Sequence, residues 1–310
     1  MHRMKVYKIL LGVVAAGAWC CGTQAGVATA QTGAMPSVAA SLASDTALES
    51  RLLDLAKAHH GKVALYATQL NTRKVVGLDA GTVVQTASVI KLTILFEAME
   101  QVRDGKAHWD DKITLLPGEA VSGSGLLLFL DTPKTLTLKD VLTLMIIMSD
   151  NTATNKCIAL AGMDDVNRMM DESGLPHTRL RRKMMDSAAV ARGEENVSTP
   201  EEMARLVETI YRGKLVDQAA SREMVEILKK VEGGIHEGLP LDIETASKTG
   251  ELPGARGETG IVFLDGRPFV LSVMSAFIDD RRTPVPEVTR IVYRYFEKLA
   301  GANTWGNRLR

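Results

Sequence analysis

The sequence predicts an α+β fold in which an antiparallel sheet flanked by helices contains an inserted all-helical part. Two patterns lead to this prediction. Runs rich in β-branched residues gather near both ends of the chain, and the middle is dominated by apolar residues at helical spacing. The length of 310 residues and a hydrophobic content of 45% are sufficient for one large domain or two closely packed ones.

The elements near the N-terminal end follow from local patterns. Leucines repeat with helical period from Asp45 until Gly61, where the pattern ends. Two β-type runs then flank the short turn Asn71–Arg73, which is typical of an antiparallel hairpin. A further apolar stripe at helical spacing predicts a buried helix face. Helices are therefore predicted at 45–61 and 88–103, and strands at 62–70 and 74–78.

The middle of the chain is predicted to be helical. Thr137 with Asp140 forms a capping-box pattern, and Pro200 after Thr199 is typical of a helix start. The segment 175–199 shows little periodicity, and a long irregular segment inside a domain is usually functional. Helices are predicted at 137–148, 152–160, 164–172, 200–210 and 218–230, and a strand or extended loop at 110–116.

The last part of the chain returns to β-type runs. Strands are predicted at 245–248, 259–264 and 269–277, followed by an amphipathic helix at 285–299. Because both ends supply strands, we expect one catalytic domain over 45–299. Its sheet part would comprise 45–87 and 236–299, its helical part 88–235, and residues 300–310 would form a tail.

The first residues have the pattern of a secretory signal peptide. Basic residues precede an apolar run, and Ala28-Thr29-Ala30 forms a small-residue cleavage site, so residues 1–30 are predicted to be removed. Residues 31–44 then form a flexible lead-in. The prediction is a secreted protein, in a bacterial periplasm, although Cys20 and Cys21 leave lipidation of the N-terminus open.

Composition excludes several classes of partner and cofactor. Thirty-seven basic residues balance thirty-seven acidic ones, which argues against nucleic acid and against an anionic membrane surface. The histidines lack metal-type spacing, so we expect no metal and no cofactor. After cleavage Cys157 is the one remaining cysteine, predicted to be a buried structural thiol. We expect a monomer without a stable membrane span that acts on a small molecule.

The pair Ser88 and Lys91 has the spacing S-x-x-K, about one helical turn. That spacing places an amine beside a hydroxyl, and a serine needs a base to become a nucleophile. Average composition alone would supply roughly one such motif in a chain of this length. The motif therefore needs partners before it indicates chemistry.

Two triplets supply those partners. Ser149-Asp150-Asn151 follows a predicted helix, and Lys248-Thr249-Gly250 follows at the end of a predicted strand. From average residue frequencies, either triplet would occur by chance in far fewer than about one chain in ten. A second hydroxyl and a cationic strand residue suit attack on a strained or activated amide that carries an anion. The three motifs together predict acyl transfer.

In this order the motifs resemble those of the penicillin-recognising serine hydrolases, and above all the class A β-lactamases. The resemblance covers residues 45–299 and implies a β-lactamase/transpeptidase-like fold. It implies that Ser88 is acylated, that Lys91 is its base or proton relay, and that Ser149 passes a proton to the leaving nitrogen. The substrate would be bound by four further residues: Asn151, Lys248, Thr249 and Gly250.

The resemblance also implies an oxyanion hole of two backbone N–H groups. One belongs to Ser88 and the other lies just after Gly250, near Leu252. Arg256 is either a second contact for the substrate carboxylate or an ordinary loop arginine. Asp150 is expected to be structural rather than catalytic.

The resemblance fails in the irregular segment. Class A β-lactamases carry there a glutamate that activates the water for deacylation, but Lys183 occupies that position here. Arg181 and Asn196 stand where the family has the arginine–aspartate pair that pins this loop, and Ser187 stands where an asparagine is expected. Asp186 is the carboxylate close by and is the candidate deacylation base. Glu194 and Glu195 would require a different path of the backbone.

Acylation and deacylation are separate steps, so the missing glutamate leaves three functions open. The protein could hydrolyse β-lactam amides with another base. It could be a D-alanyl-D-alanine peptidase or related esterase. It could also remain acylated and serve as a penicillin-binding sensor. We take β-lactam hydrolysis as the main hypothesis.

Overall fold

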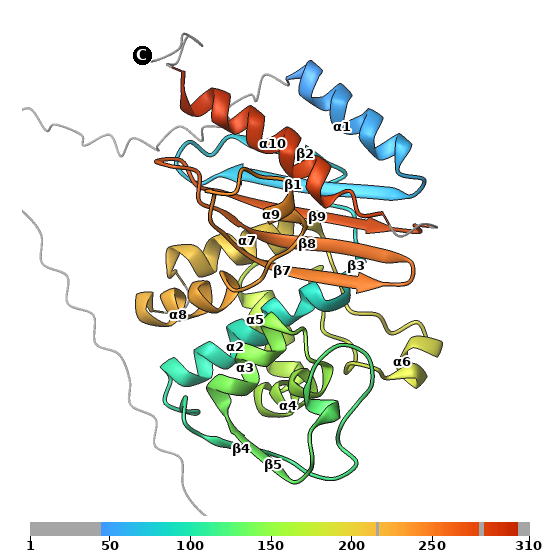
Figure 1. Ribbon diagram of the computed structural model, residues 1–310, viewed down its shortest axis with the longest axis vertical. Helices are drawn as coiled ribbons and strands as arrows, with labels where there is room; N and C mark the ends of the chain where they lie inside the picture. Colours follow the sequence, from blue (N-terminus) through green and yellow to red (C-terminus); the bar gives the residue numbers. More distant parts are fainter. Residues whose placement is uncertain (1–44, 215–216, 279–281, 303–310) are drawn as a thin grey trace, which may run out of the picture. The chain divides into compact units, whose positions relative to one another are not determined.

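A five-stranded antiparallel sheet joins the two ends of the chain in the computed structural model (Figure 1). Its central strand comes from the C-terminal part and pairs along its full length with the first strand of the chain. The strand order is β2 (Val75–Leu78), β1 (Lys62–Gln69), β9 (Phe269–Ala276), β8 (Ala255–Val262) and β7 (Thr245–Leu252). The predicted α+β fold with an antiparallel sheet is confirmed.

The structure describes residues 45–214, 217–278 and 282–302. All of them belong to one unit, Leu42–Arg310. The predicted signal peptide (1–30), the lead-in (31–44) and residues 303–310 of the predicted tail lie outside the described residues. Among the helices within these ranges, none is both long and apolar enough to cross a membrane.

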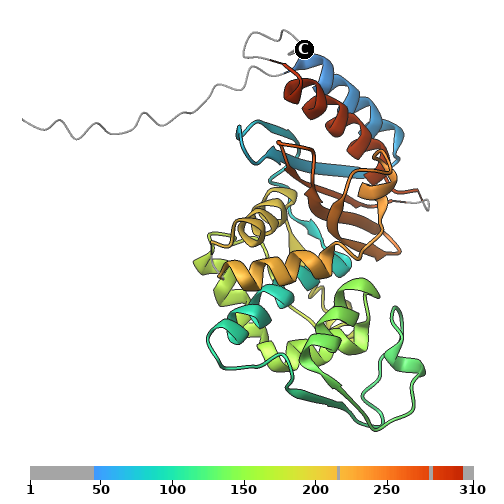
Figure 2. The same ribbon diagram turned by 60° about the vertical axis from the view of Figure 1, so that its left-hand side comes forward.

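Both faces of the sheet are covered, so every residue of β9 is buried. One face packs against α1 (Thr46–Ala58) and α10 (Val285–Ala300), which lie side by side in both views (Figures 1 and 2). The other face packs against α7 (Pro200–Arg212). The helix α7 therefore connects the sheet to the helical side of the molecule.

The helix α2 (Lys91–Arg103) lies at the centre of the helical side. Its residues from Lys91 to Met99 are all buried, as expected for a helix that is surrounded by others. Its neighbours are α3 (Leu138–Ile147), α4 (Asn151–Ala161), α5 (Met163–Glu172), α7 and α8 (Gln218–Leu228). Cys157 is buried in α4, and burial raises the pKa of its thiol to about 12, so it is an inert structural thiol.

Several elements were not predicted because they are short. They are the 3-10 turns η1 (Ala87–Ile90) and η2 (Leu127–Phe129), the strands β3 (Val84–Gln85), β5 (Lys134–Thr137) and β6 (Val197–Ser198), and the helices α6 (Ser187–Ala191) and α9 (Gly234–Glu237). The predicted extended segment at 110–116 contains β4 (Lys112–Leu115), which pairs with β5. The predicted capping box of Thr137 and Asp140 is present at the start of α3.

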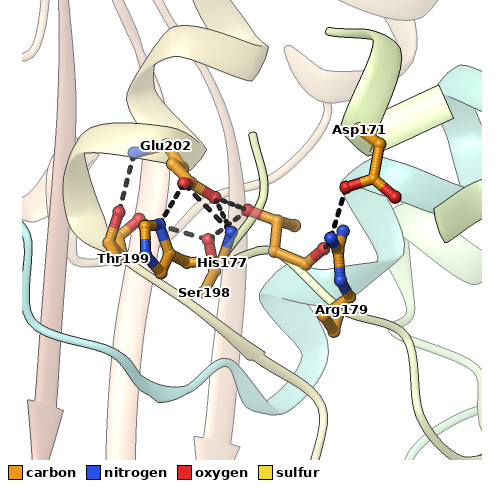
Figure 3. A network of polar contacts seen from close by, with 7 residues as sticks. Asp171, His177, Arg179, Ser198, Thr199 and Glu202 are labelled. Carbon is orange, nitrogen blue, oxygen red and sulfur yellow. Dashed lines mark hydrogen bonds and ion pairs between the residues drawn. The ribbon is translucent and has the colours of Figure 1, made fainter. Parts of the chain in front are cut away.

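The base of the segment 175–199 is closed by a polar network around Glu202 (Figure 3). The buried carboxylate of Glu202 accepts hydrogen bonds from the His177 backbone N–H at 3.1 Å and from Thr178 Oγ1 at 2.7 Å. Thr178 in turn lies 2.7 Å from Ser198 Oγ. The two ends of the segment are thus joined by the contact between Thr178 and Ser198, and the Glu202 side chain of α7 holds Thr178 in place. We call the segment 179–197 between them the active-site loop.

We expect Glu202→Ala to destabilise the base of the active-site loop. Removal of the carboxylate takes an acceptor from the His177 backbone N–H and from the buried Thr178 hydroxyl, and an unsatisfied buried group costs about 1–3 kcal/mol. Chemical denaturation and limited proteolysis measure the effect. Glu201→Ala is the control, because Glu201 is the half-buried neighbour outside this network. Equal stability of the two variants would contradict the assigned role.

Candidate active site

Ser88 lies in the 3-10 turn η1, directly before α2. The preceding residue, Ala87, has a φ of 46°, a conformation that costs energy for a residue other than glycine. Lys91 follows as the first residue of α2. The tight turn keeps Ser88 at the edge of a pocket while Lys91 is completely buried behind it.

The Lys91 amine points at the Ser149-Asp150-Asn151 triplet. Its Nζ lies 2.5 Å from Ser149 O, 3.0 Å from Ser149 Oγ and 3.1 Å from Asn151 Oδ1, all within hydrogen-bond distance. The second sequence motif is therefore joined to the first by direct hydrogen bonds.

The Ser149-Asp150-Asn151 triplet forms the turn between α3 and α4. Ser149 has a φ of 50°, which turns the chain sharply before α4 begins. The buried Asp150 carboxylate accepts backbone hydrogen bonds from Leu126 at 2.7 Å, Leu127 at 2.8 Å and Ala153 at 2.9 Å. Asp150 thus caps α4 and anchors the end of the glycine-rich segment 118–125, which is the structural role that the sequence predicts.

Lys248 brings the third motif to the same hydroxyl. Its Nζ lies 3.2 Å from Ser149 Oγ and 2.8 Å from Thr249 O, and its side chain is fully buried. Gly250, two residues along β7, packs directly on the backbone of η1. A Cβ atom there would lie 2.7 Å from Thr86 O and 3.0 Å from Val89 N. A glycine at this position is what allows β7 to approach the turn that carries Ser88.

Burial lowers the pKa of both lysines. Burial, followed by the nearby Lys248 charge, lowers the pKa of Lys91 to about 6. Burial lowers the pKa of Lys248 to about 8, against the opposing effect of Glu258. At neutral pH Lys91 is therefore mostly a neutral amine that can accept a proton, whereas Lys248 is mostly charged.

Ser88 and Asn151 line a pocket of about 160 Å³. Its walls come from η1, the start of α4, the glycine-rich segment 118–125, the active-site loop and the end of β7. They are Ala87, Ser88, Gly123, Ser124, Asn151, Arg182, Met184, Met185, Glu195, Asn196, Glu251 and Leu252. Lys91, Ser149 and Lys248 do not line the pocket but are linked to Asn151 by the hydrogen bonds given above. A nucleophile at the pocket, with a neutral amine, a second hydroxyl and a buried cation linked to its wall, can perform acyl transfer.

Comparison with known proteins agrees with this chemistry. A model of the β-lactamase enzyme family matches residues 47–296. The chain belongs to the β-lactamase enzyme family. The resemblance to class A β-lactamases is confirmed, and the protein is a serine β-lactamase-like hydrolase.

Three solved structures illustrate the likeness. PBP-A, also solved as a mutant in an acyl-enzyme complex with penicillin-G, shares 25% identity, with a TM-score of 0.76 over 82% of this chain and 97% of its own. A β-lactamase from Sphaerobacter thermophilus shares 26%, with a TM-score of 0.75 over 81% and 97%. An ancestral class A β-lactamase shares 24% and has the same fold, with a TM-score of 0.75 over 80% and 100%.

The active-site loop of this β-lactamase family member is pinned differently from the arginine–aspartate pair that the resemblance implies. Asn196 Oδ1 accepts from the backbone N–H groups of Arg181 at 2.7 Å and Arg182 at 3.0 Å. The ion pair lies one residue further inside the loop, where Arg182 donates through Nε and Nη2 to Glu195 Oε2 at 3.0 and 2.7 Å.

The carboxylates and the lysine of the loop also take unexpected places. Lys183 is exposed and does not line the Ser88 pocket. Asp186 caps α6, since its Oδ1 accepts from Ala189 N at 2.9 Å, and it does not line the pocket either. Ser187 is the exposed first residue of α6. Asp186 as deacylation base thus stays a prediction for which the geometry offers no support.

The remaining predicted residues lie around the end of β7. Leu252 lines the pocket, and Thr249 is half-buried opposite Glu258 in the ladder between β7 and β8. Arg256 is paired with Glu251 at 2.7 Å. The roles of Leu252 and Thr249 toward a substrate remain predictions.

Sequence reasoning missed the buried Glu258. Its carboxylate accepts from Ser247 Oγ at 2.6 Å and from Ile235 N at 3.1 Å, and burial raises its pKa. It therefore ties β7 to α9 directly behind Lys248 and Thr249. Glu258 directly precedes the predicted strand 259–264 and lies inside the observed β8, and an acidic residue at that position has little meaning until the strand partner is known.

Proposed function

We propose that the protein hydrolyses the amide of β-lactam antibiotics through an acyl-enzyme on Ser88. The observation that carries the proposal is the position of one hydroxyl, Ser149 Oγ, between two amines. Lys91 Nζ lies 3.0 Å and Lys248 Nζ lies 3.2 Å from it. A hydroxyl held in this way can relay a proton from a base to a leaving group.

In the acylation step, Ser88 Oγ attacks the amide carbonyl carbon. Neutral Lys91 accepts the hydroxyl proton, and backbone N–H groups at Ser88 and near Leu252 stabilise the negative oxygen. The carbon–nitrogen bond then breaks, and Ser149 gives its proton to the leaving nitrogen while it regains one from a lysine. The charged Lys248 attracts the carboxylate that β-lactams carry next to this nitrogen.

We expect the rate of acylation to depend on pH as a bell. The rate should rise through pH about 6, because Lys91 must lose its proton to act as a base. It should fall above pH about 8, because neutral Lys248 no longer attracts the substrate carboxylate. The acylation rate with a chromogenic cephalosporin across both values measures this. A rate that keeps rising above the upper value would show that the charge of Lys248 is not required.

Time-resolved intact-mass spectrometry with penicillin G tests the function. The expected result is an adduct on Ser88 that forms, then decays while penicilloate accumulates, and that is absent in Ser88→Ala. No adduct and no product would overturn the proposal. An adduct that never decays would identify a penicillin-binding sensor, and turnover of a D-Ala-D-Ala peptide alone would identify a peptidase.

A further inference from the structure

We infer that Glu195 is the general base of deacylation, in place of the loop glutamate that Lys183 replaces. This inference rests on the proposed function, because it concerns the second half of the same reaction. It arises from a carboxylate that the backbone brings beside Ser88 although the sequence places it far from the expected position.

The register of β3 and β6 explains this proximity. The two strands are antiparallel, and Gln85 is paired with Val197. The pairing continues by one residue, since Thr86 N donates to Asn196 O at 3.0 Å and Thr86 Oγ1 at 3.1 Å. In an antiparallel pair, the residues that follow one strand and the residues that precede its partner lie at the same end of the pair. Ser88 and Glu195 therefore emerge from the same end of this ladder.

The pocket around Ser88 contains two carboxylates, and their surroundings differ. Glu251 lies at the end of β7, and its side chain is 71% exposed and paired with Arg256. Glu195 lies on the opposite wall, on the active-site loop, with a side chain that is 17% exposed. A base that must activate one water beside an acyl group needs a fixed position, which favours Glu195.

Arg182 holds the Glu195 carboxylate by one oxygen. Both hydrogen bonds from Arg182 to this carboxylate go to Glu195 Oε2. Within the described part of the chain, Oε1 receives no hydrogen bond and can accept one from a water. Arg182 is thus a positioning residue. Its own guanidinium is almost buried, at 9% exposure, and Asn196 fixes its backbone N–H.

Water can reach Glu195 from a second side. Glu195 also lines a neighbouring pocket of about 620 Å³, which opens between the active-site loop and the strand ends near Val83 and Phe277. An acyl group that fills the small pocket around Ser88 would therefore not block the supply of water to the carboxylate.

The deacylation step then balances as follows. Glu195 Oε1 takes a proton from the water while the water oxygen forms a bond to the carbonyl carbon of the Ser88 ester. The tetrahedral intermediate collapses with cleavage of the bond between carbon and Ser88 Oγ. Protonated Glu195 returns the proton, through Lys91 or directly, to Ser88 Oγ, and the free acid leaves.

Glu195→Gln tests the inference, since the amide oxygen still accepts from Arg182 but cannot take a proton. We expect an adduct of penicillin G on Ser88 that forms at the wild-type rate and decays about 10²-fold or more slowly. Glu194→Gln is the matched control, because Glu194 pairs with Arg192 on the surface. The adduct on this variant should decay at the wild-type rate. Asp186→Asn and Glu251→Gln test the competing carboxylates.

Each outcome has one meaning. Wild-type decay in Glu195→Gln, or slow decay in Glu251→Gln or Asp186→Asn instead, overturns the inference but not the acyl-enzyme. Persistent acylation of the wild type itself also overturns it. Absence of any adduct on the wild type overturns the proposed function. If Glu195→Gln does not fold, Glu195→Asp decides, because it keeps the charge. The adduct on Glu195→Asp should decay more slowly than the adduct on the matched Glu194→Asp.

Discussion

Replacement of Lys91 by methionine is expected to slow acylation of Ser88 by about 10²–10⁴-fold, the usual contribution of a general base. The same variant should have a different dependence of stability on pH. The methionine fills a similar volume without a group that must lose its proton on burial. Lys57→Met, at a lysine whose side chain is 76% exposed, is the control and should change neither property.

The sign of the stability effect follows from the lowered pKa of Lys91. A free lysine has a pKa of 10.5, and in the folded protein this value is about 6. Between these values the unfolded state binds the additional proton, so the free energy of unfolding of the wild type rises with pH. This group contributes up to about 1.4 kcal/mol per pH unit. The methionine variant loses that slope.

The gain in the free energy of unfolding of the methionine variant over the wild type should therefore be largest below pH 6. It should vanish as the pH approaches the pKa of a free lysine. The hydrogen-bond contacts of Lys91 Nζ with Ser149 and Asn151 reduce this gain, because they are lost in the variant. Urea denaturation at several pH values measures both effects. Parallel stability curves for the two proteins would show that Lys91 is charged in the folded state.

Gly250→Ala is expected to be the most damaging substitution of a residue without chemistry of its own. The new methyl group would lie 2.7 Å from Thr86 O, so β7 and η1 must move apart. Such overpacking costs about 1–3 kcal/mol of stability. Displacement of Lys248 relative to Ser88 by about 1 Å would slow acylation by about 10²-fold.

The same hairpin provides a matched control for this substitution. A Cβ atom at Gly254 would meet nothing within 4 Å, so Gly254→Ala should retain both stability and acylation rate. Thermal unfolding and the rate of adduct formation with penicillin G measure the difference. Wild-type acylation in Gly250→Ala would contradict the close approach of β7 to the nucleophile.

The long elements could be predicted from the sequence because their signals are local and repeated. The apolar repeats of α1 and α10, the hairpin of β1 and β2 and the cap at Thr137 depend on neighbours a few residues away. The three motifs were predictable for another reason: their order and spacing are rare. The structure places Ser88 and Asn151 at one pocket and joins Lys91, Ser149, Asn151 and Lys248 by hydrogen bonds, and the role of each residue remains a prediction.

The active-site loop could not be predicted, because its path depends on contacts between residues far apart in sequence. A ladder of two residues such as β3 with β6 has no periodicity to detect. The pairing of Arg182 with Glu195, rather than of their neighbours, depends on which side chains the turn directs inward. Counting along the loop led to Lys183 and so to Asp186 as the carboxylate close by, whereas the backbone brings Glu195 to the pocket.

The pairing of β1 with β9 has a consequence for folding. These strands are separated by most of the chain, so their contacts close a very long loop, and such topologies fold slowly. A nascent chain that ends before β7 already contains Ser88, Lys91 and Ser149, but it lacks Lys248 and the central strand of the sheet. The set of residues predicted to perform acylation is therefore complete only after the last strands have been synthesised.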